Sequence, residues 1–378
     1  MHNRGLAQIT TGLPEIDQIM KEEIWKQNIL SPNWHLFNCS VELKLFKLAW
    51  LEEEDYRTVV FLDQRMNIPL ENFRQESFGA LSKLFPKNLE IEHPAAYIFH
   101  VGHCGSTLLS RALSIPAKVL PVREPLTLRF LAEQMHNFPR PTSLLSEREY
   151  ERLSVIILSS LERRFADDQL PIIKATSTCN NLIGPILETQ AQRRAILMFQ
   201  SFESYLAGRF KNRQISTDLR VQAKLRMEEW LKIPGAPPLN LSDLSPPQLV
   251  ALAWLTSMYR ILTASEQFPE QTFLLDFTLF LEAPDQHLSQ LAEFLGLAHE
   301  KKTIVDGYQR VSTQYSKSSD FDHSKSAKLE FEYTPETRLM AFDQARRING
   351  EQIKLGVNWV KSMIKNTPAL AKCSEYLE

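Results

Sequence analysis

Two glycines and two adjacent hydroxyl residues interrupt an otherwise apolar stretch at residues 96–113. The first part of the stretch reads as a buried strand, and the last part has the apolar spacing of a helix. Gly102 and Gly105 allow a tight turn in which successive N–H groups point at one anion, and the helix adds its positive dipole end. Ser106 and Thr107 supply further donors. The sequence therefore predicts a strand, an anion-binding loop and a helix.

The predicted loop lacks the lysine of the loops that hydrolyse ATP or GTP. In those loops the last glycine is followed by Lys and then by Ser or Thr, and the lysine reaches the outer phosphates. Here Gly105 is followed directly by Ser106. The sequence thus argues against ATP or GTP hydrolysis, and a plain packing turn between strand and helix is the alternative.

Two more apolar runs end in charged residues that could do chemistry. The run in residues 118–125 reads as a strand that ends at Arg123 and Glu124, and residues 170–174 read as a buried strand that ends at Lys174. In a parallel α/β sheet, ligands bind at the carboxyl ends of the strands. The alternatives are a helix-start carboxylate for Glu124 and a strand-edge cap for Lys174.

The loop resembles the 5′-phosphosulfate-binding loop of the sulfotransferases, whose usual form is Arg or Lys, Ser, Gly, Thr, Thr, Leu, Leu. Here it stands as His103-Cys104-Gly105-Ser106-Thr107-Leu108-Leu109. A late strand at residues 272–277 and a helix at residues 285–297 that finishes Phe-Leu-Gly-Leu are also similar to that family. The resemblance covers roughly residues 94–325 and is nearest to tyrosylprotein-type and bacterial sulfotransferases.

The resemblance implies a three-layer α/β fold of the P-loop type, with a central parallel sheet flanked by helices. It implies transfer of a sulfuryl group from 3′-phosphoadenosine 5′-phosphosulfate to a hydroxyl or amine of a small-molecule or peptide acceptor, without a metal. By position, Glu124 matches the family's general base, Lys174 the lysine on the transferring group, and His103 the residue on the bridging oxygen. The loop would hold the donor's 5′-phosphate through Gly102, His103, Cys104, Gly105, Ser106, Thr107 and Leu108.

The element that holds the donor's 3′-phosphate departs from the family's pattern. After a strand at residues 194–199, Gln200 stands at the place of an arginine and Gly208 at the place of a serine. A neutral amide thus replaces a cation that could make bidentate bonds. Three basic residues nearby could substitute: Arg209, Lys211 and Arg213. A non-catalytic or repurposed nucleotide-binding protein of the same fold is therefore one alternative, and a small-metabolite kinase is a second.

A polar stretch at residues 315–328, rich in hydroxyls and lysines, has neither helix nor strand periodicity. In sulfotransferases a basic loop in this region folds over the nucleotide, and bacterial members often show Tyr-Ser-Lys there. The resemblance therefore adds Tyr315, Ser316 and Lys317 to the donor site, and a solvated loop is the alternative. The insert at residues 211–245 is expected to form a lid or a wall of the acceptor site.

The whole composition is that of an ordinary globular protein, with 378 residues, 43% hydrophobic residues and a net charge of −2. Lysine and arginine are spread along the chain, so no nucleic-acid footprint is expected. Four scattered cysteines without metal-type spacing argue against zinc and disulfides. No signal-peptide core and no apolar run of about 20 residues is present, so we expect a cytoplasmic protein without a membrane segment.

Residues 1–92 lie outside the resemblance and read as a small α/β extension packed on a main domain of residues 93–378. Alternation predicts strands at residues 41–48 and 58–63, and helical spacing is present at residues 70–85. This extension is expected at the acceptor side or at a homodimer contact. Further helices are predicted at residues 147–165, 218–232, from Ser245 onward and at residues 336–348.

Overall fold

A parallel sheet lies at the centre of the protein. The computed structural model describes residues 28–88, 92, 94–138, 140–210, 215–312 and 335–377. The sheet has five strands in the order β5-β6-β4-β7-β8, and all neighbouring pairs are parallel. The strands are β4 (Ala96–His100), β5 (Val119–Arg123), β6 (Leu170–Lys174), β7 (Arg194–Phe199) and β8 (Thr272–Asp276). Each lies in a run where the sequence predicted a strand.

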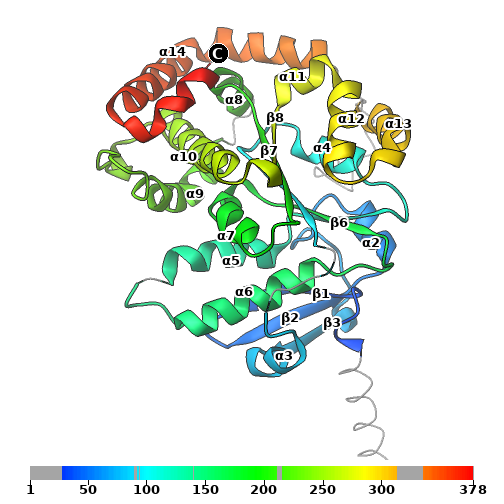
Figure 1. Ribbon diagram of the computed structural model, residues 1–378. Helices are drawn as coiled ribbons and strands as arrows, with labels where there is room; N and C mark the ends of the chain where they lie inside the picture. Colours follow the sequence, from blue (N-terminus) through cyan, green and yellow to red (C-terminus); the bar gives the residue numbers. More distant parts are fainter. Residues whose placement is uncertain are drawn as a thin grey trace, which may run out of the picture.

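Helices cover both faces of this sheet, so the predicted three-layer α/β class is confirmed (Figure 1). One face carries α4 (Ser106–Ala112), α12 (Pro284–Phe294) and α13 (Lys301–Ser312), and the other carries α7 (Ile183–Glu188) and α10 (Pro246–Gln267). The chain enters the sheet at central β4, fills the β5-β6 side and then crosses to the β7-β8 side. Ligands bind outside the carboxyl ends of the strands at such a crossing point.

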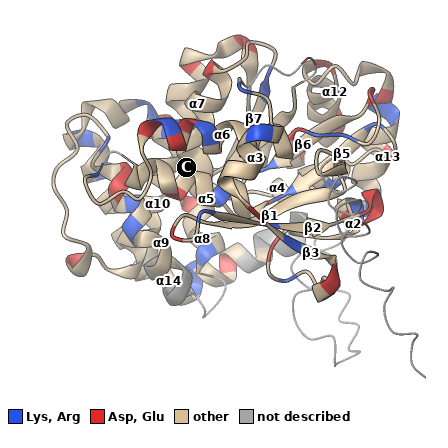
Figure 2. Ribbon diagram, turned by 90° about the horizontal axis from the view of Figure 1, so that it is seen from below, with Lys and Arg blue, Asp and Glu red and all other residues tan. Residues whose placement is uncertain are grey.

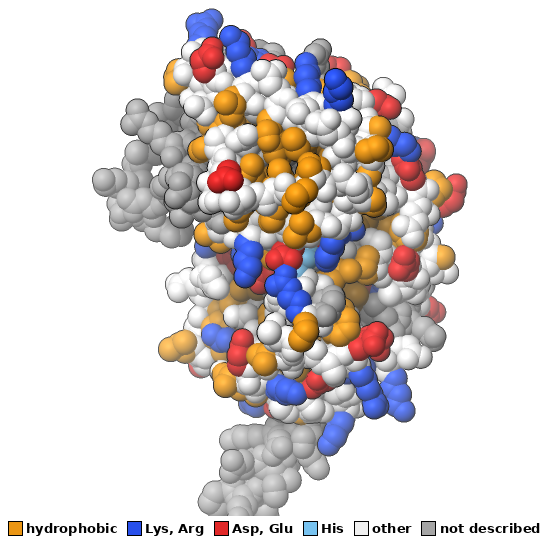
Figure 3. Space-filling view, turned by 90° about the vertical axis from the view of Figure 1, so that its left-hand side faces the viewer, with side chains coloured by type: hydrophobic (Ala, Val, Ile, Leu, Met, Phe, Trp, Pro, Cys, Tyr) orange, Lys and Arg blue, Asp and Glu red, His pale blue; other side chains and the backbone are white. Residues whose placement is uncertain are grey.

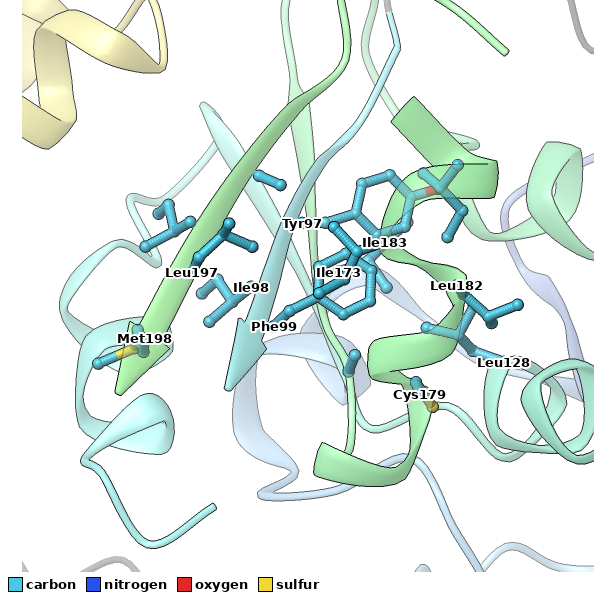
Figure 4. Close-up of a cluster of buried hydrophobic side chains, with 14 of the residues drawn as sticks. Tyr97, Ile98, Phe99, Leu128, Ile173, Cys179, Leu182, Ile183, Leu197 and Met198 are labelled. Carbon is cyan, nitrogen blue, oxygen red and sulfur yellow. The ribbon is translucent and has the colours of Figure 1, made fainter. Parts of the chain in front are cut away.

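The core is built from strands that are buried on both faces. Along β4, Tyr97 and Phe99 stack with ring centroids 5.8 Å apart, and Figure 4 shows them on the side of Leu182 and Ile183. Ile98 points to the opposite side of the same strand. Burial on two faces explains why these strands read as continuous apolar runs rather than as alternating ones.

A buried polar triad joins the amino ends of the central strands. The carboxylate of Glu162 follows α6 (Glu147–Leu161) and accepts a hydrogen bond from the Tyr97 hydroxyl. Arg193, directly before β7, donates to the same carboxylate at 2.9 and 3.1 Å. Each member of the Tyr97–Glu162–Arg193 triad is at most 2% exposed. Removing one partner of such a buried pair typically costs about 3–5 kcal/mol.

The N-terminal extension is a small antiparallel sheet in the order β1-β2-β3. Its strands are β1 (Trp34–Ser40), β2 (Leu45–Trp50) and β3 (Phe73–Ser77). Figure 1 shows it beneath α6 and α5 (Leu126–Asn137), on the far side of these helices from α10.

Two sequence predictions in this extension are wrong. Residues 58–63 are not a strand: Thr58 ends α2 (Glu53–Thr58), and the residues after it cross the end of β5, where the Leu62 N–H donates to the Arg123 carbonyl at 2.8 Å. Residues 70–85 are not one helix, because Ser77 ends β3 and caps α3 (Phe78–Leu84) by accepting from the Ala80 N–H at 3.1 Å. The strand predicted at residues 41–48 begins four residues later, at Leu45.

The predicted helices are present with shifted ends. Helix α6 ends at Leu161 rather than at residue 165, and α9 spans Ile215–Trp230. Helix α10 begins after Ser245 at its N-cap with proline in its first turn, as predicted, and Gln248 completes a capping box. Helix α14 (Pro335–Asn366) continues beyond the predicted residue 348 and is kinked at Asn349. The other elements are α8 (Phe202–Arg209), α11 (Phe277–Glu282) and the 3-10 segments η1 (Leu70–Asn72), η2 (Ser177–Leu182), η3 (Leu241–Asp243), η4 (Pro269–Gln271), η5 (Ala298–Glu300) and η7 (Pro368–Tyr376).

A buried charged network fixes α9 against α5 and α10. His136 on α5 lies 3.1 Å from the carboxylate of Glu229, and Arg260 on α10 donates to the same carboxylate at 2.6 Å. Burial lowers the pKa of His136 and outweighs the opposite effect of Glu229. On the side of the molecule where α9 lies, Figure 3 shows acidic and basic side chains close together below an apolar area.

Charges of both signs are interspersed over the fold, as Figure 2 shows from below. Among the residues that the structure describes, no helix has the length and apolar composition needed to cross a bilayer.

Candidate functional site

A cavity of about 430 Å³ lies at the carboxyl edge of the sheet, where β4, β5 and β6 end. Nine residues predicted for the site line it together: Gly102, His103, Gly105, Ser106, Thr107, Leu108, Glu124, Lys174 and Arg209. The predicted Cys104 and Gln200 do not line it. The predicted Tyr315, Ser316 and Lys317 lie outside the described residues.

The loop between β4 and α4 has a left-handed backbone at three places. Gly102, His103 and Gly105 have φ values of 95°, 54° and 71°. A Cβ atom at Gly105 would lie 2.0 Å from Cε2 of Phe277. Gly105 is therefore required both by its backbone conformation and by the aromatic ring that lies against it.

His100 holds the start of the loop. Its Nδ1 accepts a hydrogen bond of 2.9 Å from the Gly102 N–H, so its proton is on Nε2, which donates to the Ala175 carbonyl at 2.9 Å. The ring is 6% exposed and ties the end of β4 to the end of β6. His100 was not among the residues predicted for the site, although a histidine in an apolar run, two residues before a glycine, was a usable signal.

His103 and Arg209 meet at the mouth of the loop. Nη1 of Arg209 can only donate, so Nε2 of His103 accepts this bond and the imidazole carries its proton on Nδ1. Nε of Arg209 is buried and has no hydrogen-bond partner among the described residues. Arg209 thus brings a cation to the cavity, at one of the positions that the sequence offered as a substitute for the missing arginine.

Glu124 and Lys174 form an ion pair in the cavity. The Glu124 N–H also donates to the Lys174 carbonyl at 2.7 Å, and Glu124 has a left-handed φ of 52°. The side chain of Lys174 is 1% exposed and that of Glu124 is 19% exposed. A carboxylate and an ammonium group are therefore held in direct contact, each at the end of its own strand.

Gln200 and Cys104 support the loop from behind. Nε2 of Gln200 donates to the His103 carbonyl at 3.2 Å, and the residue is fully buried. The Gln200 carbonyl in turn accepts from Nε1 of Trp254 at 3.1 Å. Burial raises the pKa of Cys104 to about 12, so its thiol is protonated near neutral pH. Both residues therefore shape the loop rather than face the cavity.

A row of hydroxyl residues after Lys174 forms another wall, which the sequence analysis did not single out. Thr176, Ser177 and Thr178 line the cavity at the start of η2. Buried Arg226 on α9 donates to the carbonyl and the hydroxyl of Ser177, both at 3.0 Å. Three consecutive hydroxyl residues, one residue after a strand that ends in lysine, were the available signal.

The N-terminal extension contributes a wall beside the ion pair. Phe61, Asp63 and Arg65 line the cavity. Nε of Arg65 lies 2.9 and 3.0 Å from the two carboxylate oxygens of Asp63, and its guanidinium lies 3.7 Å from the centre of the Phe61 ring. Three aromatic residues also line the cavity: Tyr205, Phe277 and Phe342.

Neither a protein-family model nor a curated protein matches the sequence. Among solved structures, the chain is similar to a sulfotransferase from Alicyclobacillus acidocaldarius, with 14% identity over 73% of this chain and 97% of that chain and a TM-score of 0.35. It is similar to the sulfotransferase domain from the curacin biosynthetic pathway, with 16% identity over 55% and 75% of the two chains and a TM-score of 0.35. It is also similar to the sulfotransferase domain of the Synechococcus PCC 7002 olefin synthase, with 14% identity over 68% and 98% and a TM-score of 0.35. At these identities and TM-scores the similarity carries no argument about function, which must rest on the residues of the cavity.

Proposed function

We propose that the protein is a sulfotransferase that moves a sulfuryl group from 3′-phosphoadenosine 5′-phosphosulfate to a hydroxyl or an amine of a small-molecule or peptide acceptor. The observation that carries this proposal is the convergence of an anion-binding loop, Glu124 and Lys174 on one cavity. The loop has no lysine after Gly105, which disfavours a kinase or an NTPase.

The cavity suits an adenine nucleotide with two phosphate groups. Its volume of about 430 Å³ falls within the range of about 300–1,000 Å³ that is usual for small-molecule sites. The turn at Gly105 and the hydroxyls of Ser106 and Thr107 supply donors for the 5′-phosphate. Arg209 supplies a cation for the 3′-phosphate, because Gln200 is committed to the loop backbone.

The Glu124–Lys174 pair suits the transfer step. The acceptor oxygen attacks sulfur, the bond from sulfur to the 5′-phosphate oxygen breaks, and the acceptor's proton passes to the Glu124 carboxylate. Lys174 stabilises the charge on the transferring group, and its move from Glu124 to the donor would free the carboxylate to act as a base. On this proposal His103 would donate to the bridging oxygen through Nδ1–H, since its Nε2 accepts from Arg209. The acceptor would lie against Phe61, Asp63 and Arg65.

A non-catalytic nucleotide-binding protein of this fold is the second candidate. The observation that favours it is the buried position of Gln200, which does not line the cavity. The 3′-phosphate would then depend on Arg209, without the family's arginine, and this weakens the case for a working donor site.

Binding and transfer must be measured together. We expect adenosine 3′,5′-bisphosphate at about 100 times its dissociation constant to stabilise the protein by about 2.7 kcal/mol, read as a melting shift. We also expect sulfuryl transfer from the labelled donor to a panel of phenols, alcohols and amines, strongly reduced in Lys174→Ala. Lys118→Ala is the matched control, because Lys118 forms an exposed ion pair with Asp168. Binding without transfer would favour the second candidate, and absence of binding would refute both.

A further inference from the structure

A second cavity, of about 230 Å³, lies at the carboxyl end of α4, away from the loop between β4 and α4. Four arginines from separate elements line it: Arg57 on α2, Arg111 on α4, Arg123 at the end of β5 and Arg310 on α13. Among the described residues, no aspartate or glutamate lines this cavity.

Arg123 carries a buried charge, and the hydrogen-bond partners that the described residues give it are all neutral. It is 2% exposed, and it donates to the hydroxyls of Ser110 and Ser114 at 3.2 and 2.7 Å. Its Nη1 donates to three carbonyl oxygens, those of Tyr56, Arg57 and Val59, at 3.2, 3.2 and 2.8 Å. Burial, and then the charges of Arg111 and Arg57, lower the pKa of Arg123 to about 10. A buried charge without a counter-ion is costly, and like charges nearby add to the cost.

Among the described residues, the acidic groups near this cluster pair with Arg57 and not with Arg123 or Arg310. Glu53 pairs with Arg57, and the carboxyl end of α4 offers only about half a negative charge. Neither Arg123 nor Arg310 has a carboxylate of the described residues within ion-pair distance. Within the described part of the chain, no carboxylate therefore neutralises Arg123 or Arg310.

We propose that this second cavity binds a small oxyanion of the phosphate or sulfate type with two negative charges. Guanidinium groups bind such oxyanions through paired N–H donors. The volume is far above the need of a single water molecule, yet it falls below the range of about 300–1,000 Å³ that is usual for drug-sized ligands. A tetrahedral anion or a phosphoryl group fits this size, whereas a nucleotide does not.

The second cavity is separate from the proposed transfer site, yet it is linked to it. Arg123 and Glu124 are consecutive residues, and each lines a different cavity. Helix α4 likewise has Ser106 at the first cavity and Arg111 at the second. Because both cavities attract anions, the test must distinguish them by substitution.

The test is thermal unfolding of the full chain in dilute buffer, with sodium phosphate or sodium sulfate against sodium chloride at matched ionic strength. We expect phosphate and sulfate to raise the melting temperature more than chloride does, because specific binding adds to screening. Arg111→Gln and Arg310→Gln should each weaken the phosphate affinity about tenfold or more. Lys174→Ala, which alters the first cavity, should keep the response.

Arg310→Glu gives a second readout that does not need an added ligand. It places a carboxylate beside the cluster, so we expect a higher melting temperature in dilute buffer and no further gain from phosphate. A lower melting temperature of Arg310→Glu would refute the claim that the arginine cluster needs a counter-ion. Equal responses to phosphate and chloride would overturn the proposal, as would a phosphate response that Lys174→Ala removes and Arg310→Gln leaves unchanged.

The source of the anion is decided by comparing inorganic phosphate with glycerol 3-phosphate. Binding of either compound supports the proposal if Arg111→Gln and Arg310→Gln weaken that binding. Binding of phosphate alone assigns a free anion, and binding of both extends the site to phosphoryl groups on larger molecules.

Discussion

Replacing Gly105 with alanine tests the geometry of the loop. The new Cβ would lie 2.0 Å from Cε2 and 2.2 Å from Cζ of Phe277, and Gly105 has a φ of 71°. The left-handed backbone costs an alanine about 1–2 kcal/mol. Overpacking adds about 1–3 kcal/mol, because the ring or the loop must move. We therefore expect Gly105→Ala to lower the free energy of unfolding and to abolish the melting shift caused by adenosine 3′,5′-bisphosphate.

Gly235→Ala is the matched control for this prediction. Gly235 has a φ of 75°, and nothing lies within 4 Å of the position its Cβ would take. The two variants therefore share the backbone cost, and their difference in urea unfolding reports the contact with Phe277 alone. Adding Phe277→Leu should recover part of the loss in Gly105→Ala, because leucine lacks Cε2 and Cζ. Equal losses in the two alanine variants would refute the close approach of loop and ring.

Three further changes test the site and the fold. Glu124→Gln should lower turnover by about two to four orders of magnitude with unchanged melting shifts by the bisphosphate, and wild-type turnover would make Glu124 a structural carboxylate. Lys174→Ala should weaken donor binding or turnover by about 1.5–3 kcal/mol in calorimetry and kinetics, and a far smaller effect would place the anion elsewhere. Burial, with a smaller effect of Arg163, lowers the pKa of His35 from 6.5 to about 3, so only the unfolded chain takes up this proton as the pH falls below 6.5. The stability contributed by neutral His35 is thus present above pH 6.5 and is lost as the pH falls toward 3. The free energy of unfolding should fall by about 2 kcal/mol between pH 7 and pH 5. Urea unfolding of His35→Gln should show a flatter pH dependence.

The parallel sheet could be predicted because its strands are fully buried. Residues 96–100, 170–174 and 194–199 form apolar runs that end in or are followed by polar residues, and their short length favours strands over helices. Burial on both faces is a property of the strand itself and therefore leaves a direct trace in the sequence.

The extension was harder to predict because its elements depend on distant partners. Residues 58–63 have a strand-like composition, yet their backbone bonds to the end of β5, which lies some 60 residues away in the chain. Residues 70–85 have helical spacing, but pairing of β3 with β2 overrides it in the first half. Tertiary pairing of this kind cannot be recognised from local periodicity.

The site shows the same division between local and distant causes. The loop and the ends of β5 and β6 are local features, and the sequence placed Glu124 and Lys174 at the strand ends that line one cavity. The use of Gln200 as a brace depends on the His103 carbonyl, which lies about 100 positions earlier in the chain. The wall formed by Phe61, Asp63 and Arg65 requires the extension to fold back onto the sheet.

The Tyr97–Glu162–Arg193 triad has a consequence for how this sequence can change over time. Its members come from β4, from the end of α6 and from the residue before β7, so they are neighbours only in the folded protein. Loss of any one of them leaves a buried charge or hydroxyl without its partner, whereas replacing all of them with apolar groups of similar volume can be neutral. We therefore expect these positions to be inherited as a unit, with relatives carrying either the complete triad or an apolar set in its place.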